Sequence, residues 1–155
     1  NIQSDIVFDW EKIMALEGNS GPYLQYTYAR TQSVLEKAKY LTPRPNNTSP
    51  FNPSPNLGEG NQKGGVFSAE ERSILRYFYR FDEVVEEAAE RYAPNLVCNF
   101  LFELAQRYNT FYNKHSILQA ESDSSKKLRL LITEAVGRGL KTGLGVLGIE
   151  APDRM

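Results

Sequence analysis

Apolar residues recur at every third or fourth position along most of this sequence, a spacing that limits the fold to packed α-helices. The clearest run has Pro94 at its start, where the amide hydrogen that proline lacks would have no partner. Each such helix must bury its apolar stripe against a neighbour. The sequence therefore predicts an all-α helical bundle of about five helices. The run that follows Pro94 comprises Leu96, Val97, Phe100, Leu101, Leu104, Tyr108 and Phe111.

Two helices are expected in the first part of the chain. A short one occupies roughly residues 9–16 and ends at Gly18. A longer one starts at Gly21-Pro22 and runs to about Tyr40. Its core-facing stripe is predicted to comprise Leu24, Tyr28, Thr31, Leu35 and Ala38.

A capping box marks the next helix. In Ser68-Ala69-Glu70-Glu71, the serine and glutamate side chains can satisfy each other's unpaired backbone amides. Asp82 could cap a new helix, so the pattern allows a break near Phe81. The acidic pairs Glu70-Glu71 and Glu86-Glu87 are expected on exposed helix faces. The apolar face of this segment comprises Ile74, Phe78, Phe81, Val85, Ala88 and Tyr92.

The last predicted helix runs from about Ser125 to Leu147 and contains four glycines. A glycine inside a helix costs about 0.5–1 kcal/mol relative to alanine. The glycines therefore indicate close packing of another helix, or fraying toward Gly148. They are Gly137, Gly139, Gly143 and Gly145, and the apolar stripe comprises Leu128, Leu131, Ile132, Ala135, Val136, Leu140 and Leu144.

Residues 42–66 differ from the rest of the chain. They are rich in proline, asparagine, serine and glycine and have few apolar residues. Such a segment cannot bury enough surface to offset the entropy of ordering it, so we expect a flexible surface loop. The sequence predicts one domain over residues 1–155, with a leading segment at 1–17 and this loop at 42–66.

Two tyrosines and an arginine share one side of the predicted helix that starts at Gly21. At about 100° per residue, Tyr23, Tyr26 and Arg30 fall within roughly 60° of one another. Tyrosine rings can stack on unpaired bases, and a guanidinium can bind a phosphate or a base edge. This face therefore suits single-stranded RNA. Spacing alone equally allows tyrosines that line a wet edge of the core.

Three blocks of the sequence resemble arginine–tRNA synthetases and occur in the same order. They are FDWEKIMALEGNSGPYLQYTYAR, RYAPNLVCNFLFELAQRYNTFYN and the final GLGVLGIEAPDRM. The first resembles the segment that leaves the catalytic domain. Together the blocks cover most of the chain outside 42–66. The resemblance implies a C-terminal, all-α, DALR-type domain that binds the anticodon arm of tRNA.

The resemblance also implies which residues contact RNA. Five residues match family positions at the anticodon loop. Three lie on the predicted helix that starts at Gly21, one is an aromatic residue near the end of the predicted helix that starts at Pro94, and one is the final methionine. An aromatic residue that some relatives have just beyond the position of Tyr112 is not present here: NKHS stands in its place, and of these four residues only His115 could stack on a base. The implied RNA-binding residues are Tyr23, Tyr26, Arg30, Tyr112 and Met155.

Composition and missing motifs restrict the function further. With 18 basic and 19 acidic residues, the chain should not grip a phosphate backbone over a broad surface. No apolar run is long enough for a transmembrane helix, and the start lacks a signal-peptide pattern. Neither a DNA nor a membrane partner is expected. The HIGH- and KMSKS-type signatures of class I synthetases are absent, and one His and one Cys make no metal site.

The sequence thus predicts a cytoplasmic tRNA-recognition domain with no catalytic, metal or cofactor site of its own. Its expected partners are the anticodon stem-loop of tRNA(Arg) and the catalytic domain of the same polypeptide. That domain would use ATP with Mg, and this segment alone should be inactive. Two alternatives remain: a helical protein–protein interaction module, and the anticodon domain of another class I synthetase.

Overall fold

The computed structural model describes Glu11, residues 20–41 and residues 67–155. Within these ranges there is no strand, which confirms the all-α prediction. The helix predicted at 9–16 and the loop predicted at 42–66 lie outside the described residues, except for Glu11. No described helix is long and apolar enough to cross a membrane. The described helices are α2 (Gly21–Leu41), α3 (Ala69–Phe78), α4 (Phe81–Glu90), α5 (Pro94–Lys114) and α6 (Asp123–Val146).

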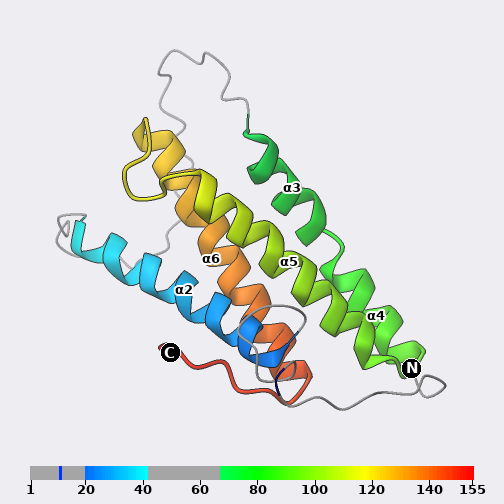
Figure 1. Cartoon of the computed structure of the whole chain (residues 1–155). Helices are drawn as coiled ribbons and strands as arrows, with labels where there is room; N and C mark the ends of the chain where they lie inside the picture. The colour runs from blue at the N-terminus through cyan, green and yellow to red at the C-terminus, as the bar shows by residue number, and fades with distance from the viewer. Residues whose placement is uncertain (1–10, 12–19, 42–66) are drawn as a thin grey trace, which may run out of the picture.

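Helix α5 contacts each of the other four helices and forms the centre of the bundle (Figure 1). Helices α3 and α4 follow one another along one side of α5, and α3 also reaches α6. On the other side, α2 packs across α6 and α5. After α6 the chain turns back and runs beside the first half of α2 (Figure 1). Helix α2 and this C-terminal segment thus share one face of the molecule.

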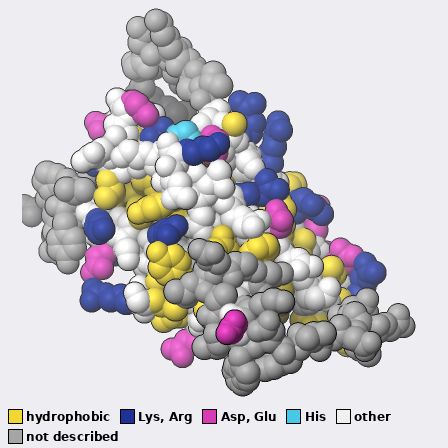
Figure 2. Space-filling model, in the orientation of Figure 1, with side chains coloured by type: hydrophobic (Ala, Val, Ile, Leu, Met, Phe, Trp, Pro, Cys, Tyr) yellow, Lys and Arg dark blue, Asp and Glu magenta, His cyan; other side chains and the backbone are white. Residues whose placement is uncertain are grey.

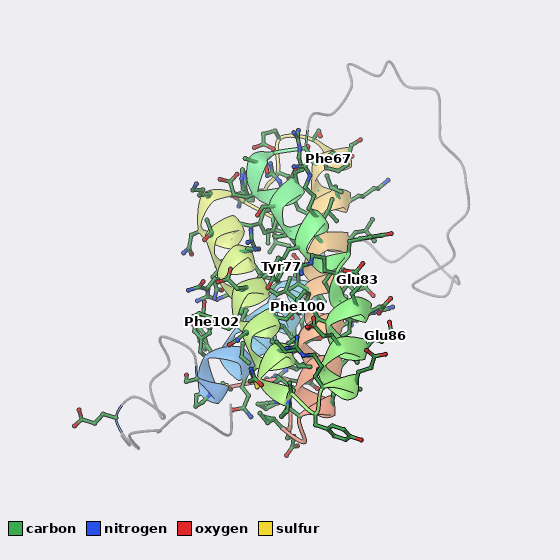
Figure 3. All side chains as sticks on the ribbon, turned by 90° about the vertical axis from the view of Figure 1, so that its right-hand side faces the viewer. Phe67, Tyr77, Glu83, Glu86, Phe100 and Phe102 are labelled. Carbon is green, nitrogen blue, oxygen red and sulfur yellow. The ribbon has the colours of Figure 1, made fainter. Side chains whose placement is uncertain are left out.

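The apolar stripe predicted for α5 is confirmed as the core. Leu101, Leu104 and Phe111 are completely buried, and Leu96 at the start of the helix is partly buried. Aromatic rings extend the core toward α3, where Tyr77 stacks on Phe100 with ring centroids 4.7 Å apart (Figure 3). Burial of side chains of this size contributes about 1.5–3 kcal/mol each. Helix α5 is therefore held from several sides, which fixes the residues at its end.

Three of the four glycines of α6 allow close approach of other helices. A methyl group added to Gly137 would lie 2.6 Å from Thr31 Oγ1 on α2, and one on Gly143 would lie 2.5 Å from Leu101 Cδ2 on α5. Gly139 faces the ring of Phe78 on α3 equally closely. A methyl group on Gly145 would meet nothing within 4 Å. Close packing therefore explains Gly137, Gly139 and Gly143, and Gly145 has no such contact.

The capping box and the break after α3 are both confirmed. The Ser68 side chain accepts a hydrogen bond from the Glu71 amide at 3.1 Å, and the Ser68 amide donates to Glu71 Oε2 at 2.9 Å. The predicted cap at Asp82 is wrong, because α4 begins at Phe81 and has Arg80 as its N-cap residue. Asp82 lies in the first turn, where its negative charge favours the helix dipole.

Three expectations about exposure are wrong. Tyr92 is 91% exposed, because the chain reverses between α4 and α5 with Tyr92 at a φ of 51°. Leu131 is 50% exposed, because α6 turns Arg129 and Thr133 toward the core instead. Spacing shows which residues share a face but not which face is buried. Glu71 is buried and the neighbouring Glu70 is only partly exposed, whereas Glu86 and Glu87 are exposed as expected, with Glu83 and Glu86 pointing away from α4 (Figure 3).

A buried ion pair explains the burial of Glu71. Arg129 Nε donates to Glu71 Oε1 at 3.1 Å, and both side chains are less than a tenth exposed. Arg129 Nη1 also donates to the Ser116 carbonyl oxygen at 2.7 Å, and Nη2 lies 3.0 Å from Glu121 Oε2. One guanidinium thereby joins α3, α6 and the connection between α5 and α6. A pair 58 positions apart leaves no local pattern that sequence inspection can detect.

The neighbouring Glu70 should make stability depend on pH in acid. Lys114 Nζ donates to Glu70 Oε1 at 2.8 Å, and His115 Nε2 lies 3.0 Å from Oε2. The hydrogen bond from Lys114, followed by that from His115, lowers the pKa of Glu70 from 4.5 to about 2. Because the folded pKa is depressed, the contribution of Glu70 is present above pH 4.5 and is lost as pH falls toward 2.

We therefore expect Glu70→Gln to be less stable than the parent above pH 4.5, with the difference disappearing toward pH 2. Denaturant unfolding at a series of pH values measures it. Glu86→Gln, an exposed change on α4, is the matched control and should give no such trend. A stability difference between Glu70→Gln and the parent that stays constant over this pH range would contradict the lowered pKa of Glu70.

Candidate RNA-binding surface

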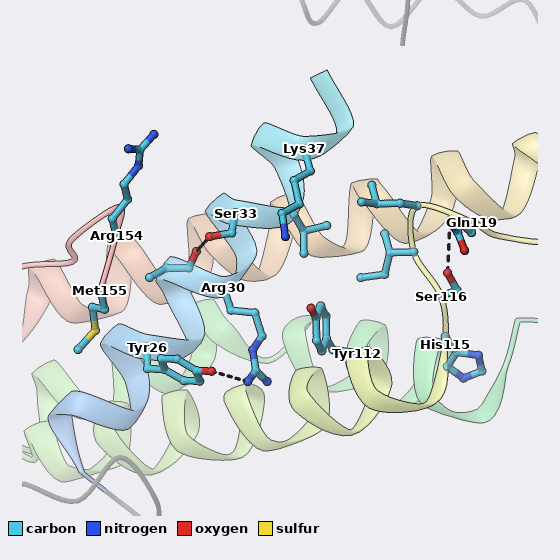
Figure 4. Close-up of a pocket in the computed structure, with 14 residues that line it drawn as sticks. Tyr26, Arg30, Ser33, Lys37, Tyr112, His115, Ser116, Gln119, Arg154 and Met155 are labelled. Atoms are coloured by element: carbon cyan, nitrogen blue, oxygen red, sulfur yellow. Dashed lines mark hydrogen bonds between the residues drawn. The ribbon is translucent and has the colours of Figure 1, made fainter. Parts of the chain in front are cut away.

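An open groove of about 790 Å³ lies between α2, the end of α5 with the turn after it, and residues 154–155 (Figure 4). None of the described Asp or Glu side chains lines it. Its charged lining side chains Arg30, Lys37 and Arg154 are all cationic. The groove therefore favours an anionic ligand. The complete lining is Tyr26, Ala29, Arg30, Ser33, Val34, Lys37, Tyr112, His115, Ser116, Ile117, Leu118, Gln119, Arg154 and Met155.

Arg30 lies between two tyrosine rings in this groove (Figure 4). Its guanidinium carbon is 4.8 Å from the centroid of Tyr26 and 4.9 Å from that of Tyr112. Arg30 Nη2 also donates to the Tyr26 hydroxyl at 2.9 Å. The two tyrosines are 39% and 38% exposed, so both rings remain accessible to a ligand. The packing of α2 on α5 thus brings Tyr26 and Arg30 of α2 together with Tyr112 of α5.

Asn109 on α5 connects this group to the rest of α2. Its Oδ1 accepts a hydrogen bond from Arg30 Nη1 at 2.7 Å. Its Nδ2 donates to the Tyr23 hydroxyl at 2.9 Å and to Thr27 Oγ1 at 3.1 Å. No sequence pattern indicates a role for Asn109. Its place one turn before Tyr112 becomes informative only once α2 is known to pack against α5.

Tyr23 is placed differently from the other predicted RNA-binding residues. Its ring packs against Phe102 with centroids 5.6 Å apart, and its hydroxyl contacts Asn109. It is partly buried and does not line the groove. The structure brings Tyr26, Arg30, Tyr112 and Met155 to one groove and leaves Tyr23 beside it.

Contacts with α2 determine where the C-terminal segment lies. Gln25 Nε2 donates to the Glu150 carbonyl oxygen at 2.7 Å, and the Tyr28 hydroxyl donates to Asp153 Oδ1 at 2.8 Å. Burial, and then the bond with Asp153, raises the pKa of Tyr28. Arg154 Nη2 lies 3.0 Å from Glu36 Oε1. These contacts bring Met155 to the groove on the side of Tyr26 (Figure 4).

His115 lies at the opposite end of the groove (Figure 4). Its ring packs against Phe111 with centroids 5.6 Å apart and contacts Glu70 through Nε2. Ile117 and Leu118 follow it as apolar lining residues. On the face that carries α2, Figure 2 shows hydrophobic side chains interspersed with separate Lys and Arg side chains. This arrangement suits a compact RNA element better than a long phosphate backbone.

Metal binding has no evident site in the part of the chain that the structure describes. There, no three or more His, Cys, Asp or Glu side chains are grouped so that they could hold a metal ion. Burial raises the pKa of the single cysteine, Cys98. That shift disfavours its thiolate form, which is the form that binds metals or attacks substrates.

Comparison with known proteins gives consistent results. The family model described as "DALR anticodon binding domain" matches residues 24–155. The chain is 38% identical over 156 residues to an arginine–tRNA ligase of Fusobacterium nucleatum, covering 100% of this chain and 25% of the relative. It is 35% identical over 153 residues to one of Phocaeicola vulgatus, covering 99% of this chain and 23% of the relative.

A solved structure shows the same likeness. Thermus thermophilus arginyl-tRNA synthetase superposes with a TM-score of 0.75 at 31% identity, covering 96% of this chain and 23% of that protein. The chain therefore spans about a quarter of the length of the relatives it matches.

Proposed function

Because this chain belongs to the DALR anticodon-binding domain family of arginine–tRNA ligases, we propose that its groove binds the anticodon loop of tRNA(Arg). The observation that carries this proposal is Arg30, held between two accessible tyrosine rings. It has no ion pair with any described carboxylate, so its charge is available to a ligand. Rings and a cation in one groove match the chemistry of unpaired RNA.

In this proposal, unpaired bases stack on Tyr26 and Tyr112. Each such contact contributes about 1–3 kcal/mol. Met155 gives the base that stacks on Tyr26 an apolar neighbour, and Lys37 neutralises a loop phosphate at the rim of the groove. Tyr23 is proposed to contact the same loop from outside the groove lining. Few phosphates are neutralised, so affinity should depend only shallowly on salt.

The genetic code specifies which base should matter most. Every arginine codon has guanine at its second position, so every arginine anticodon has a central cytosine. Arginine side chains only donate hydrogen bonds, and cytosine offers O2 and N3 as acceptors. Uracil has an N–H at its own N3, which would oppose a donor. We propose that Arg30 reads the central cytosine through these acceptors.

The rest of the proposal concerns the full-length ligase. The chain spans about a quarter of its relatives, so aminoacylation would take place in a catalytic domain elsewhere in the same polypeptide. That domain would use ATP with Mg in the cytoplasm. Binding of the anticodon loop here would position the distant acceptor end of the tRNA in that active site.

Titration of the chain with two arginine anticodon stem-loops tests this function. One loop carries the central cytosine, and the other carries uracil at that position. We expect the cytosine loop to bind roughly 5- to 150-fold more tightly, because loss of a well-matched contact to a base edge costs about 1–3 kcal/mol. Equal affinity would exclude cytosine reading. Absence of binding to both loops would favour the protein-interaction module over an RNA-binding domain.

Tyr26→Ala should weaken RNA binding without unfolding the bundle. Loss of one stacking partner predicts a Kd increase of roughly 5- to 150-fold, corresponding to about 1–3 kcal/mol. The melting temperature should change little, because Tyr26 is 39% exposed. Tyr79→Ala is the matched control, since Tyr79 follows α3 outside the groove and is 83% exposed. If Tyr26→Ala melts the domain, Tyr26 belongs to the core instead.

A further inference from the structure

We propose that Asn109 is an uncharged clamp, which holds the Arg30 guanidinium in the groove without neutralising it. This inference rests on the proposed RNA-binding function of the groove and extends it to a residue that does not line the groove. Asn109 is a positioning residue here, because it acts through Arg30 rather than on the ligand. Its contact with Arg30 joins α5 to α2.

Two side chains of α2 determine which way the Asn109 amide points. The Thr27 hydroxyl is buried and donates its proton to the Tyr23 carbonyl oxygen at 2.9 Å. It can therefore only accept a hydrogen bond from Asn109. The Tyr23 hydroxyl takes the second proton of the same Nδ2. Because the nitrogen faces these two oxygens, Oδ1 is directed to Arg30.

The orientation of Asn109 restricts Arg30 in turn. A long arginine side chain on a helix surface otherwise samples many rotamers. Here one Nη1 proton goes to Asn109 and one Nη2 proton to the Tyr26 hydroxyl. A guanidinium has five N–H donors in a fixed fork. Three donors therefore remain for a ligand, already positioned between the rings of Tyr26 and Tyr112.

The lack of charge on Asn109 matters as much as its geometry. An aspartate at this position would offer the same acceptor oxygen to Arg30 but would form an ion pair with it, and it would lose the hydrogen bonds that Nδ2 donates to Tyr23 and Thr27. That pair would cancel the charge that attracts phosphate and strengthens hydrogen bonds to a base. Arg30 has no ion pair with any carboxylate of the described residues. The asparagine thus fixes Arg30 while leaving its charge to the RNA.

Proton NMR of the free chain tests the clamp without RNA. Arg30 lies within 5 Å of two ring centroids, so ring currents should shift its side-chain protons upfield. We expect Asn109→Leu to lose these shifts and Asn109→Asp to keep them. Thr27→Val, which removes one orienting acceptor, should reduce them. Unchanged shifts in Asn109→Leu would overturn the positioning role.

RNA titration tests the charge argument with the same variants. Asn109→Asp should bind the cytosine anticodon loop roughly tenfold more weakly, because the new carboxylate competes with the RNA for the Arg30 guanidinium. If Asn109→Asp binds with the same affinity as the parent, the lack of charge at position 109 is not needed for RNA binding. Asn109→Leu should also weaken binding, but add nothing in an Arg30→Met background. Additive losses would show that Asn109 does not act through Arg30.

These two measurements separate the inference from the proposed function. If the parent chain binds neither anticodon loop, the proposed function fails, and the ring-current shifts still decide whether Asn109 positions Arg30. If the parent binds and the shifts of Asn109→Leu do not change, the function stands and the clamp is wrong. Melting temperatures of all variants show whether any loss of binding reflects unfolding.

Discussion

Arg129→Met is expected to lower the free energy of unfolding by about 3–5 kcal/mol, because it leaves the Glu71 carboxylate buried without a counter-charge. The two side chains are only 7% and 6% exposed and are joined by a 3.1 Å contact. The change also removes the hydrogen bond to the Ser116 carbonyl oxygen. Helices α3 and α6 and the turn after α5 would lose a shared connection. Denaturant unfolding followed by circular dichroism measures the loss.

Glu121→Gln is the matched control for this prediction. Glu121 pairs with the same guanidinium, but its side chain is 75% exposed. Exposed pairs contribute about 0–1 kcal/mol, so this variant should remain close to the parent. Adding Glu71→Leu to Arg129→Met should recover part of the stability, because no buried charge then remains. If Arg129→Met costs no more than Glu121→Gln, the buried pair is not what holds these elements together.

The buried pair also affects the groove. Ser116 lines the far end of the groove, and Arg129 holds its carbonyl oxygen from the core side. Loss of Arg129 should therefore loosen that rim as well as the bundle. We therefore expect Arg129→Met to weaken RNA binding as well as stability. Elsewhere in the groove, as at Tyr26, the two effects should separate.

The elements of the fold could be predicted from sequence because their rules are local. The α5 stripe, the capping box at Ser68 and the break before α4 each depend on residues within a few positions. The buried face of α6 could not be predicted as well. Arg129 is polar but buried because its partner, 58 positions away, is brought next to it by packing. Leu131 is apolar but exposed.

The same distinction applies to the candidate site. Tyr26 and Arg30 are four positions apart on one helix, so helical spacing alone placed them together. Tyr112 and Met155 lie on other segments and were identified only through family resemblance. Asn109 had neither signal, because its hydrogen bonds join positions 79 or more apart. Helical spacing therefore predicts site residues that share one helix. The packing of two helices is needed to bring the remaining residues of the candidate site next to them.

Arg30→Met is expected to produce the largest loss of RNA binding. Hydrogen bonds to a charged group contribute about 1.5–3 kcal/mol, so the Kd for the cytosine loop should rise roughly 10- to 150-fold. Stability should change little, because Arg30 lines an open groove and its hydrogen bond with Asn109 is only partly buried. Titration at several salt concentrations measures both affinity and salt slope. Arg76→Met removes one exposed cation from α3, outside the groove, and should have little effect.

The preference for one central base over another distinguishes hydrogen-bond recognition of cytosine by Arg30 from electrostatic attraction that is independent of sequence. If Arg30 reads cytosine, the preference for the cytosine loop over the uracil loop should shrink in Arg30→Met. Arg30→Lys should keep the charge but lose the planar fork that Asn109 and Tyr26 hold, so affinity should recover in part while the preference does not. Full recovery of both by lysine would mean that Arg30 acts as a point charge. A preference unchanged in Arg30→Met would assign cytosine reading to another residue of the groove.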